Sequence, residues 1–418
     1  MSDTFLPGSG FDTYESQDKV LVQMDGSREC AVAVRILQQQ GFAVAGAAVR
    51  LAAEQTADAE SAKKAAEALG IECIVLNAEA LAGQDADVLG EGGTPLVKLE
   101  ALAKELGLAE VAVKNESANP TWSFKDRGTA SCIAHARALG YAKVGTVSSG
   151  NMAASVAAYA AAAGMEAFIL VKGNVADEKL APIAIYGPHL LRVAGPYEEL
   201  YRESLRLGAE RGIYFMNSDV PFRVAGSRTI AYEIAEDRGF RVPDWVIVPV
   251  SAGGNLRGIV NGFEDLRRAG LTDRLPRFIC AQTASVAPVA SAFAAGSARI
   301  SRFPDNETIA HAIDNPFPPS GNRVLAELRR LGGTAGTASE GEIVRAQADL
   351  ARCGLFGQPA SCVPLAVLRR ARTAGIVAEG ESAVLVMTGG GLKYAAAFAA
   401  HRLEWRDCDL ASLPAYLK

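Results

Sequence analysis

The sequence predicts an α/β protein with mainly parallel, doubly wound sheets, preceded by a small N-terminal β-α-β-α-β unit. Short apolar runs alternate with amphipathic helical runs along most of the chain. Three glycine-rich turns each follow such an apolar run, where a strand end exposes backbone N–H groups. At 418 residues the chain exceeds what one core usually holds, so two or three domains are expected.

The N-terminal quarter has its own pattern. Residues 1–18 are polar and are predicted to be disordered or loosely docked. In residues 19–81, three strand-like runs (VLVQM, FAVAGAAVRL, ECIVL) alternate with two helical runs (RECAVAVRILQQQ, DAESAKKAAEALG). Strands joined through helices pair in parallel, so this segment is predicted to form one small parallel sheet. A polar linker at 82–90 marks the boundary, and a second region is placed at 88–418.

The second region continues the alternation. Helices are predicted at LEALAKELG, GTASCIAHARALG, MAASVAAYAAAAG, DEKLAPIAIYG, PYEELYRESLRLGAERG, LRGIVNGF, GEIVRAQADLARCG and PASCVPLAVLRRART. Strands are predicted at VAVKNE, KVGTV, EAFILV, HLLRVAG, WVIVPV, RFICAQ and AVLVM. Residues 296–325 are expected to be loop-rich, either as a lid facing a substrate or as an ordinary surface loop.

One stretch, NPTWSFKDRG at residues 119–128, carries the strongest chemical signal. Asn-Pro-Thr predicts a turn, and Lys125 follows the apolar Phe124 at the opening of a helix. A lysine placed there can be desolvated, which lowers its pKa and lets the amine form a Schiff base. The alternative is a surface lysine paired with Asp126.

The three glycine-rich turns are SSGN (148–151), SAGGN (251–255) and TGGG (388–391). Glycine-rich turns bring backbone N–H groups close to an anion. One lysine together with three such turns suggests a phosphorylated cofactor, held by its phosphate and bonded through its aldehyde.

This set of motifs, in this order, resembles the fold type II pyridoxal-phosphate enzymes (tryptophan synthase β-like), and the threonine synthase family most closely. The resemblance runs from about Leu89 to about Lys393 and rests on LGEGGTPLVKLEALAKELGL, VKNESANPTWSFKDRG, VSSGNMAASVAAYAAAAGM, KLAPIAIYG, GSRTIAYEI, VPVSAGGNLRGI and VMTGGGLK. It implies a two-subdomain architecture, with a mobile smaller subdomain near 130–235 and a site in the crevice between the two. It also implies pyridoxal 5′-phosphate as cofactor and a homodimer.

The resemblance assigns roles residue by residue. Lys125 carries the cofactor and moves protons at the substrate. Thr388 faces the pyridine nitrogen and Asn151 faces the ring hydroxyl. The backbone N–H groups of five residues hold the cofactor phosphate: Ser251, Ala252, Gly253, Gly254 and Asn255. Ser148, Ser149 and Asn151 receive the substrate carboxylate. Each assignment has a simpler alternative. SAGGN can be a tight glycine turn, Thr388 can merely end a strand, and Ser149 and Asn151 can act as helix N-caps.

Several positions depart from the family pattern. Trp122 replaces a glycine and Met152 a threonine, while Ala225 and Gln358 each replace a glutamate. A bulky ring and the loss of two carboxylates imply a reshaped pocket for the substrate side chain. Lys179 and Arg228 match basic family positions and could bind a substrate phosphate, or could be solvated helix charges.

The resemblance, together with these departures from it, leaves three functions open. The first is a lyase of amino-acid biosynthesis that converts O-phosphohomoserine to threonine and phosphate. The second is a diverged enzyme that performs β-replacement or elimination on an activated serine or threonine, such as O-phosphoserine. The third is a binding or scaffold protein without activity, which the intact lysine and glycine turns disfavour.

The N-terminal unit resembles the start of the PP-loop ATP pyrophosphatases. Its first turn reads DGSREC, where that family has SGGxDS, and Asp25 places a negative charge where ATP phosphates would lie. Residues 19–81 are also too short for a whole pyrophosphatase domain. A degenerate, non-catalytic fragment is therefore favoured over retained nucleotide binding.

Composition disfavours several other classes. Net charge is −5, so a nucleic-acid partner is not expected. The alanine-rich run MAASVAAYAAAAGMEAFILV contains Glu166 and predicts a buried helix and strand rather than a membrane span. The N-terminus lacks a signal-peptide pattern. Seven scattered cysteines and four separated histidines fit free thiols in the cytoplasm and no metal site.

Overall fold

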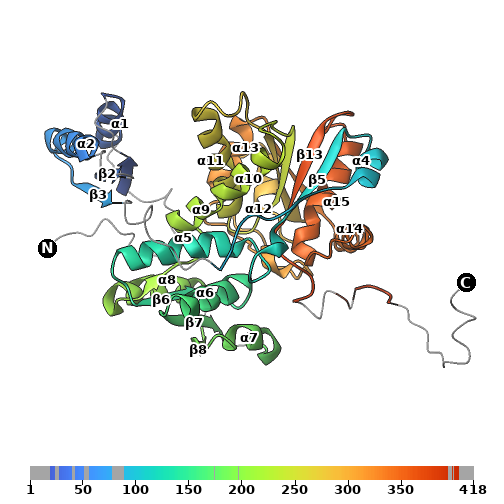
Figure 1. Ribbon diagram of the computed structural model, residues 1–418, viewed down its shortest axis with the longest axis horizontal. Helices are drawn as coiled ribbons and strands as arrows, with labels where there is room; N and C mark the ends of the chain where they lie inside the picture. The colour runs from blue at the N-terminus through green and yellow to red at the C-terminus, as the bar shows by residue number, and fades with distance from the viewer. Residues whose placement is uncertain are drawn as a thin grey trace, which may run out of the picture.

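The structure is a computed structural model, and it describes residues 19–23, 28–39, 43–50, 56–77, 89–173, 175–195, 197–393, 398 and 400–403. The predicted N-terminal tail, the acidic turn at Asp25 and most of the linker at 82–90 lie outside these residues. The strands of the described residues form three sheets, and Figure 1 shows the helices that cover them.

The first sheet is the N-terminal unit. Strands β1 (Lys19–Gln23), β2 (Ala43–Arg50) and β3 (Cys73–Asn77) pair in parallel in that order. Helices α1 (Arg28–Gln39) and α2 (Thr56–Leu69) connect them and bury Val34, Ala62 and Ala66 against Val44. The predicted β-α-β-α-β order is confirmed.

The second sheet has six strands in the order β12-β11-β10-β13-β5-β4. Its strands are β4 (Leu96–Lys98), β5 (Glu110–Asn115), β10 (Trp245–Pro249), β11 (Arg277–Thr283), β12 (Thr334–Ala338) and β13 (Ser382–Met387). All neighbouring pairs are parallel except β4 with β5. Strands β10 and β13 are buried at every residue, as expected for central strands covered by helices on both faces.

Helices cover both faces of this larger sheet. On one face lie α4 (Glu100–Leu106), α14 (Glu340–Arg352) and α15 (Pro359–Thr373), which pack around Trp245 and Ile247. On the other lie α10 (Arg228–Asp237), α11 (Gly254–Arg268), α12 (Pro288–Ala294) and α13 (Gly321–Arg330), packed around Val246 and Val248. Alternate residues of β10 thus face opposite cores, which makes this part doubly wound.

The third sheet is smaller and parallel, in the order β8-β7-β6-β9. It consists of β6 (Lys143–Val147), β7 (Glu166–Lys172), β8 (His189–Val193) and β9 (Tyr214–Phe215), and its helices are α5 (Lys125–Ala138), α6 (Asn151–Ala162), α7 (Asp177–Ala184) and α8 (Tyr197–Arg211). In Figure 1 these helices lie below those of the larger sheet. The small side chains of α6 are almost all buried, because this helix packs against both α5 and the sheet.

Some elements were not predicted. These are α9 (Pro221–Gly226), α10, α12, α13, β4, β9 and β12. Strand β12, with the sequence TAGTA, lies at the sheet edge and lacks the large apolar residues that mark a strand. The loop-rich prediction for 296–325 is wrong at its end, because α13 begins at Gly321; before it lie a loop and the short 3₁₀ helix His311–Ile313. Among the described residues, no helix combines the length and apolarity that crossing a bilayer requires.

Candidate active site

Three of the chemically suggestive segments lie side by side because their strands are neighbours. Strand β13 lies between β10 and β5, and all three run parallel. SAGGN follows β10, TGGG follows β13, and the lysine stretch follows β5 after the 3₁₀ helix Glu116–Ala118. Carboxyl ends of parallel strands meet at one edge of a sheet, which is where ligands bind in such folds. The sheet order therefore brings the three segments to one edge.

The lysine stretch is hydrogen-bonded to the TGGG turn. Phe124 N donates to Thr388 O at 3.0 Å, and Gly390 N donates to Trp122 O at 3.1 Å. Ser123 and Gly389 form an antiparallel bridge between these bonds. Two segments more than 260 residues apart in sequence are thus fixed to each other at the first turn of α5.

Lys125 is the first residue of α5 and is partly buried, with its Nζ 4.6 Å from the centroid of the Phe124 ring. Burial, followed by the positive charge of Arg223, lowers the pKa of the Lys125 amine to about 7. A large part of this amine is therefore neutral near neutral pH, which is the state in which it attacks an aldehyde. The surface-lysine alternative, with Asp126 as partner, does not fit, because Asp126 accepts instead from the backbone N–H and hydroxyl of Thr121.

The helix α9 joins the lysine segment to the SAGGN turn. Arg223 Nη1 donates to Lys125 O at 3.4 Å, and the neighbouring Val224 packs against Gly254, where an added Cβ would lie 3.4 Å from its Cγ2. Glycine at 226 lets α9 lie this close to α5, because a Cβ there would lie 2.2 Å from Arg127 O. The amino ends of α5 and α11 are therefore separated by a single short helix.

The SAGGN turn has the features of a phosphate site. Gly253 has φ +96° and caps α11, so the first backbone N–H groups of a 15-residue helix face out of the turn. A Cβ at Gly253 would lie 2.9 Å from Ser320 Cβ, and Ser320 N donates to Ala252 O, so the end of the 296–320 loop packs against the turn.

Orphaned polar atoms test whether a cofactor fits. Asn255 is 9% exposed, yet neither atom of its carboxamide has a hydrogen-bond partner in the described part of the chain. The buried Ser123 Oγ next to Lys125 is also unpaired there. Buried polar groups without partners are rare in native proteins. A phosphorylated group bonded to Lys125 would supply acceptors for the two donors, Asn255 Nδ2 and Ser123 Oγ, so the residues present fit pyridoxal phosphate.

The SSGN turn reaches the same place from the smaller sheet. It follows β6, and Asn151 opens α6 with its side chain buried. Asn151 Nδ2 donates to Gln358 Oε1 at 3.1 Å, and Lys393 Nζ donates to Asn151 Oδ1 at 3.2 Å. Ser148 and Ser149 are partly exposed at the same turn, where backbone N–H groups of α6 can receive a carboxylate.

Thr388 is buried at the end of β13, and its Oγ1 lies 3.1 Å from the hydroxyl of Ser361 on α15. Ser361 Oγ also accepts from Gly389 N at 2.8 Å. These contacts hold the threonine hydroxyl at the strand end beside Phe124. Its role toward a pyridine nitrogen stays a prediction.

Trp122 lies at this site with an unusual backbone. Its φ is +61° in the left-handed region, and its side chain is 58% exposed. A non-glycine residue there costs about 1–2 kcal/mol, which agrees with the glycine expected from the family resemblance. Met152, the second departure, is buried and accepts from Ser218 Oγ at 3.8 Å.

The structure does not bring Lys179 and Arg228 into contact with the other predicted residues. Lys179 is exposed on α7 of the smaller sheet. Arg228 Nη1 forms an ion pair with Asp265 Oδ2 at 3.0 Å. The exposure of Lys179 favours the solvated-charge alternative, whereas Arg228 is engaged in an ion pair between α10 and α11.

Two basic residues of the site were missed. Arg223 is 4% exposed and donates to Met216 O through Nε and Nη2 and to Thr129 Oγ1 through Nη1. Lys393 ends the TGGGLK block and reaches both Thr121 and Asn151. The sequence feature that could have indicated Arg223 is the polar segment NSD at 217–219, which follows a short strand. For Lys393 the only such feature is its closeness in sequence to TGGG.

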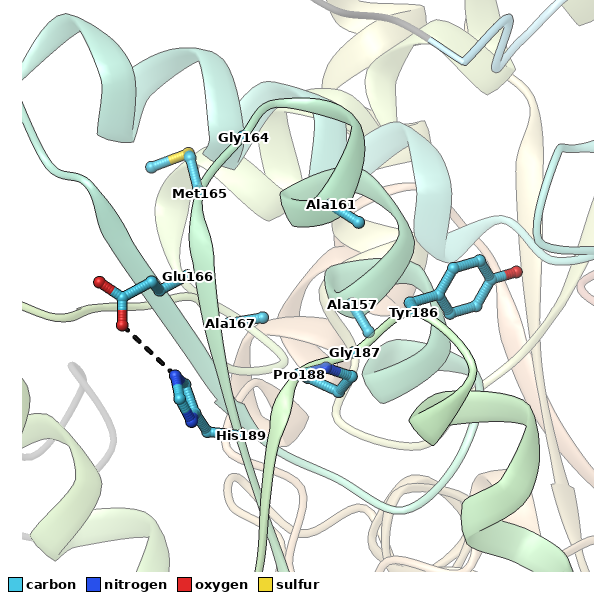
Figure 2. Close-up of a pocket in the computed structure, with 10 residues that line it drawn as sticks. All are labelled: Ala157, Ala161, Gly164, Met165, Glu166, Ala167, Tyr186, Gly187, Pro188 and His189. Carbon is cyan, nitrogen blue, oxygen red and sulfur yellow. Dashed lines mark hydrogen bonds and ion pairs between the residues drawn. The ribbon is translucent and has the colours of Figure 1, made fainter.

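A separate cavity of about 230 Å³ is not part of this site. Figure 2 shows it between the end of α6, at Ala157 and Ala161, and the starts of β7 and β8, where His189 Nε2 lies 3.3 Å from Glu166 Oε2. Asn151 lies at the opposite end of α6, ten residues or about 15 Å from Ala161. The cavity therefore lies at the amino ends of β7 and β8, whereas the candidate active site lies at the carboxyl ends of the strands.

Comparisons with known sequences agree with this geometry. Residues 88–389 match the family described as "Pyridoxal-phosphate dependent enzyme". The chain is 40% identical over 334 residues to a threonine synthase of Methanocaldococcus jannaschii, covering 79% of this chain and 82% of that one. It is 37% identical over 305 residues to a threonine synthase of Methanosarcina acetivorans, covering 72% and 75%.

Solved structures show the same fold. A maize serine racemase superposes with a TM-score of 0.64 at 22% identity, covering 81% of this chain and 94% of the other. A threonine deaminase from Solanum lycopersicum gives a TM-score of 0.61 at 20% identity, covering 81% and 85%. At these identities the likeness concerns the fold alone.

Proposed function

The chain belongs to the pyridoxal-phosphate dependent enzymes, in a threonine synthase-like branch of fold type II lyases, and we propose that it releases phosphate from an O-phosphorylated hydroxy-amino acid. The reference reaction is conversion of O-phosphohomoserine to threonine and phosphate. Its substrate is a small amino acid, and phosphorylation of that substrate is part of the proposal.

Pyridoxal phosphate, when bound, supplies an electron sink for the substrate α-carbon. The chain's own residues bind, orient and move protons. Lys125 would carry the cofactor aldehyde and, once displaced by the substrate amine, its free amine would take protons from carbon. A pKa of about 7 suits this, because a base with a pKa near the operating pH transfers protons in both directions.

The SAGGN turn and Asn255 would hold the cofactor phosphate, while Ser148, Ser149 and Asn151 would orient the substrate carboxylate. Thr388 would give the pyridine nitrogen a neutral hydroxyl partner, which does not enforce ring protonation. Such a partner favours elimination and replacement.

Arg223 is our candidate for the substrate phosphate. Its described hydrogen bonds go to carbonyl and hydroxyl oxygens, so its buried positive charge has no carboxylate directly bonded to it. Burying a charge is costly unless an opposite charge compensates it. A phosphate bound next to Lys125 would provide that compensation.

The observation that carries the proposal is that Lys125, SAGGN and TGGG lie at one edge of the larger sheet, where the SSGN turn of the smaller sheet joins them. The test incubates cofactor-loaded protein with O-phosphohomoserine, O-phosphoserine and threonine, and reads phosphate, ammonia and product mass. We expect phosphate and threonine from phosphohomoserine. Phosphate without threonine would contradict the threonine synthase reaction.

One observation favours a second function. Trp122 stands at the position where the family resemblance expects glycine, and its exposed ring leaves less room for a long substrate side chain. β-Replacement or elimination on an activated serine or threonine would then be the reaction. Turnover of O-phosphoserine at least tenfold faster than of phosphohomoserine would support this alternative.

Three further assignments complete the proposal. A homodimer rests on the family resemblance, and light scattering tests it. Cys132, Cys280, Cys353 and Cys362 are free thiols, which is consistent with the reducing cytoplasm. The β1–β3 unit is proposed to be a non-catalytic PP-loop-like fragment, and ATP binding by the whole protein would overturn this.

A further inference from the structure

Thr129 carries a buried hydroxyl at the place where three helices of the site meet. It lies four residues after Lys125 on α5 and is fully buried. Its Oγ1 is 2.9 Å from Lys125 O, 2.7 Å from Ser155 Oγ on α6 and 3.2 Å from Arg223 Nη1 on α9. One oxygen atom therefore contacts the helix of the lysine, the helix of the SSGN turn and the helix that packs against the SAGGN turn.

The direction of one of these three hydrogen bonds is fixed by chemistry. A hydroxyl has one proton, so Thr129 can donate either to Lys125 O or to Ser155 Oγ. A guanidinium group donates and never accepts, so Thr129 Oγ1 accepts from Arg223 in both arrangements. The contact between Thr129 and Arg223 therefore does not depend on where the hydroxyl protons lie.

The guanidinium of Arg223 is held by backbone oxygens on its other sides. Its Nε and Nη2 donate to Met216 O at 3.2 and 2.9 Å, and Nη1 also donates to Lys125 O at 3.4 Å. Its aliphatic part lies against α5, because a Cβ on Gly128 would lie 2.6 Å from Arg223 Cγ. Among the hydrogen bonds of Arg223 to described residues, Thr129 thus provides the one side-chain acceptor, which a substitution can remove.

All of these acceptors are neutral oxygens, so they hold Arg223 without cancelling its charge. The charged and titratable groups around the guanidinium are Lys125, Asp126 and Cys132 on α5, Tyr201 on α8 and Tyr214 on β9. Asp126 is the carboxylate of this set, and it accepts from Thr121. The positive charge acts on the neighbouring amine, and burial together with this charge lowers the pKa of Lys125 to about 7.

We propose that Thr129 is a positioning residue, which holds the Arg223 guanidinium against the first turn of α5 so that its charge keeps Lys125 reactive toward the aldehyde of pyridoxal phosphate. The inference deepens the proposed function and rests on it, since it concerns the lysine that would carry the cofactor. Valine at 129 has nearly the shape of threonine but no oxygen. It would leave Arg223 Nη1 with the 3.4 Å contact to Lys125 O alone, and the guanidinium would turn toward water or Asp126.

The sign of the effect follows from the charges. Either movement weakens the repulsion between the guanidinium and the ammonium form of Lys125, so the pKa of this amine rises. A smaller fraction of the amine is then neutral at a given pH below the midpoint. Since the neutral amine attacks the aldehyde, uptake of pyridoxal phosphate becomes slower at that pH.

The experiment measures the rate at which apoprotein takes up pyridoxal phosphate as a function of pH, by stopped-flow absorbance. It compares wild type with Thr129→Val, Thr129→Ser and Thr373→Val. In Thr129→Val we expect the midpoint to rise by about half a pH unit, which makes uptake at pH 6 about threefold slower. Thr129→Ser keeps the hydroxyl and should restore the wild-type midpoint.

Thr373 on α15 is the matched control. Its hydroxyl donates at 3.0 Å to Arg369 O, four residues earlier in the same helix, as Thr129 Oγ1 does to Lys125 O. Thr373 is exposed, and none of the contacts described for the site involves it. Thr373→Val should therefore leave the midpoint at its wild-type value.

A double-mutant cycle with Arg223→Met separates positioning from packing. Once the guanidinium is absent there is no charge to position, so adding Thr129→Val should shift the midpoint no further. A merely structural role for Thr129 predicts the same shift in both backgrounds. Thr129→Ala removes the same oxygen and gives the same expectations, so it replaces valine if Thr129→Val does not fold.

Two outcomes would overturn the inference. One is a wild-type midpoint in a Thr129→Val protein that keeps the wild-type circular dichroism spectrum. The other is an equal shift with and without Arg223. Failure of the proposed function looks different: borohydride would then fix no cofactor on Lys125 in the wild-type protein, or cofactor-loaded wild type would release no phosphate from either phosphorylated substrate.

Discussion

At the scale of the residue, the reactivity of Lys125 comes from its place at the start of a helix and from its burial. The amino end of α5 carries the positive end of the helix dipole, which disfavours an ammonium group there. Burial and the Arg223 charge act in the same direction. All three effects favour the neutral amine that bonds to an aldehyde.

The first prediction concerns this amine. Since its pKa is about 7, the rate at which apoprotein takes up pyridoxal phosphate should rise through about pH 7 and level off by pH 8–9. An ordinary lysine, with a pKa near 10.4, would give a rate that still rises tenfold per pH unit there. Stopped-flow absorbance measures this rate.

The control for this prediction uses Arg223. Arg223→Met removes a charge that lowers the pKa of Lys125, so the midpoint should move to higher pH, whereas Arg223→Lys should leave it nearly unchanged. A wild-type rate that keeps rising beyond pH 9 would contradict the lowered pKa.

The second prediction concerns Trp122. Glycine at this position removes the left-handed strain, so Trp122→Gly should stabilise the protein by about 1 kcal/mol, seen as a higher thermal midpoint. It should also raise kcat/KM for phosphohomoserine relative to phosphoserine, because the ring no longer occupies the site.

Phe240 is the matched control for this change. It has φ +60° and follows α10, and none of the contacts described above for the candidate site involves it. Phe240→Gly should raise the thermal midpoint similarly and leave the substrate preference unchanged. If Phe240→Gly alters the preference as much as Trp122→Gly does, the pocket role of Trp122 is wrong.

At the scale of the element, the site depends on three helices packed through glycine. Gly128 on α5 and Gly226 on α9 let these helices approach, and a Cβ on Gly258 of α11 would lie 2.5 Å from Ser227 Cβ. Two ion pairs also hold α5 in place, because Arg127 contacts Glu116 beside β5 and Glu233 on α10. Small backbone shifts of α9 therefore change the distance between Lys125 and the SAGGN turn.

The third prediction tests this packing. Gly226→Ala would place a Cβ 2.2 Å from Arg127 O, so α9 must move away from α5. We expect destabilisation by about 1–3 kcal/mol and cofactor affinity at least tenfold weaker. Gly341 on α14 is the control, since its Cβ would meet no atom nearer than 3.8 Å and alanine is the better helix former. Equal effects of the two substitutions on cofactor affinity would contradict the proposed spacing role.

At the scale of the whole molecule, the two larger sheets build the site together. The six-stranded sheet brings three segments to one edge, and the four-stranded sheet adds the SSGN turn through β6 and α6. Lys393 and Gln358 connect the two across Asn151. In the described residues, the contacts of the site come from the chain after Gly90.

The fourth prediction follows from this distribution. A chain that begins at residue 88, where the family match also begins, should bind pyridoxal phosphate with a dissociation constant within about twofold of the full chain. Equilibrium titration of both proteins measures this. Loss of cofactor binding, or failure of the shorter chain to fold, would show that the N-terminal unit supports the site.

Local residue patterns were enough to predict the order of most elements and the chemical content of the site. Lys125 behind Phe124, and three glycine turns after apolar runs, could be found because these signals are local. The β-α-β-α-β unit was predictable for the same reason, since periodicity is a property of neighbouring residues. Elements with weak local patterns, such as β12 and α9, were missed.

No local pattern predicted which distant residues lie together in the folded chain. Strand order placed β13 between β10 and β5, and no local pattern contains that order. It also gave Arg223 and Lys393 their partners, while leaving Lys179 on the surface and Arg228 paired with Asp265. The physical reason is that a side chain's pKa and hydrogen bonds depend on groups brought close by packing, whatever their separation along the chain.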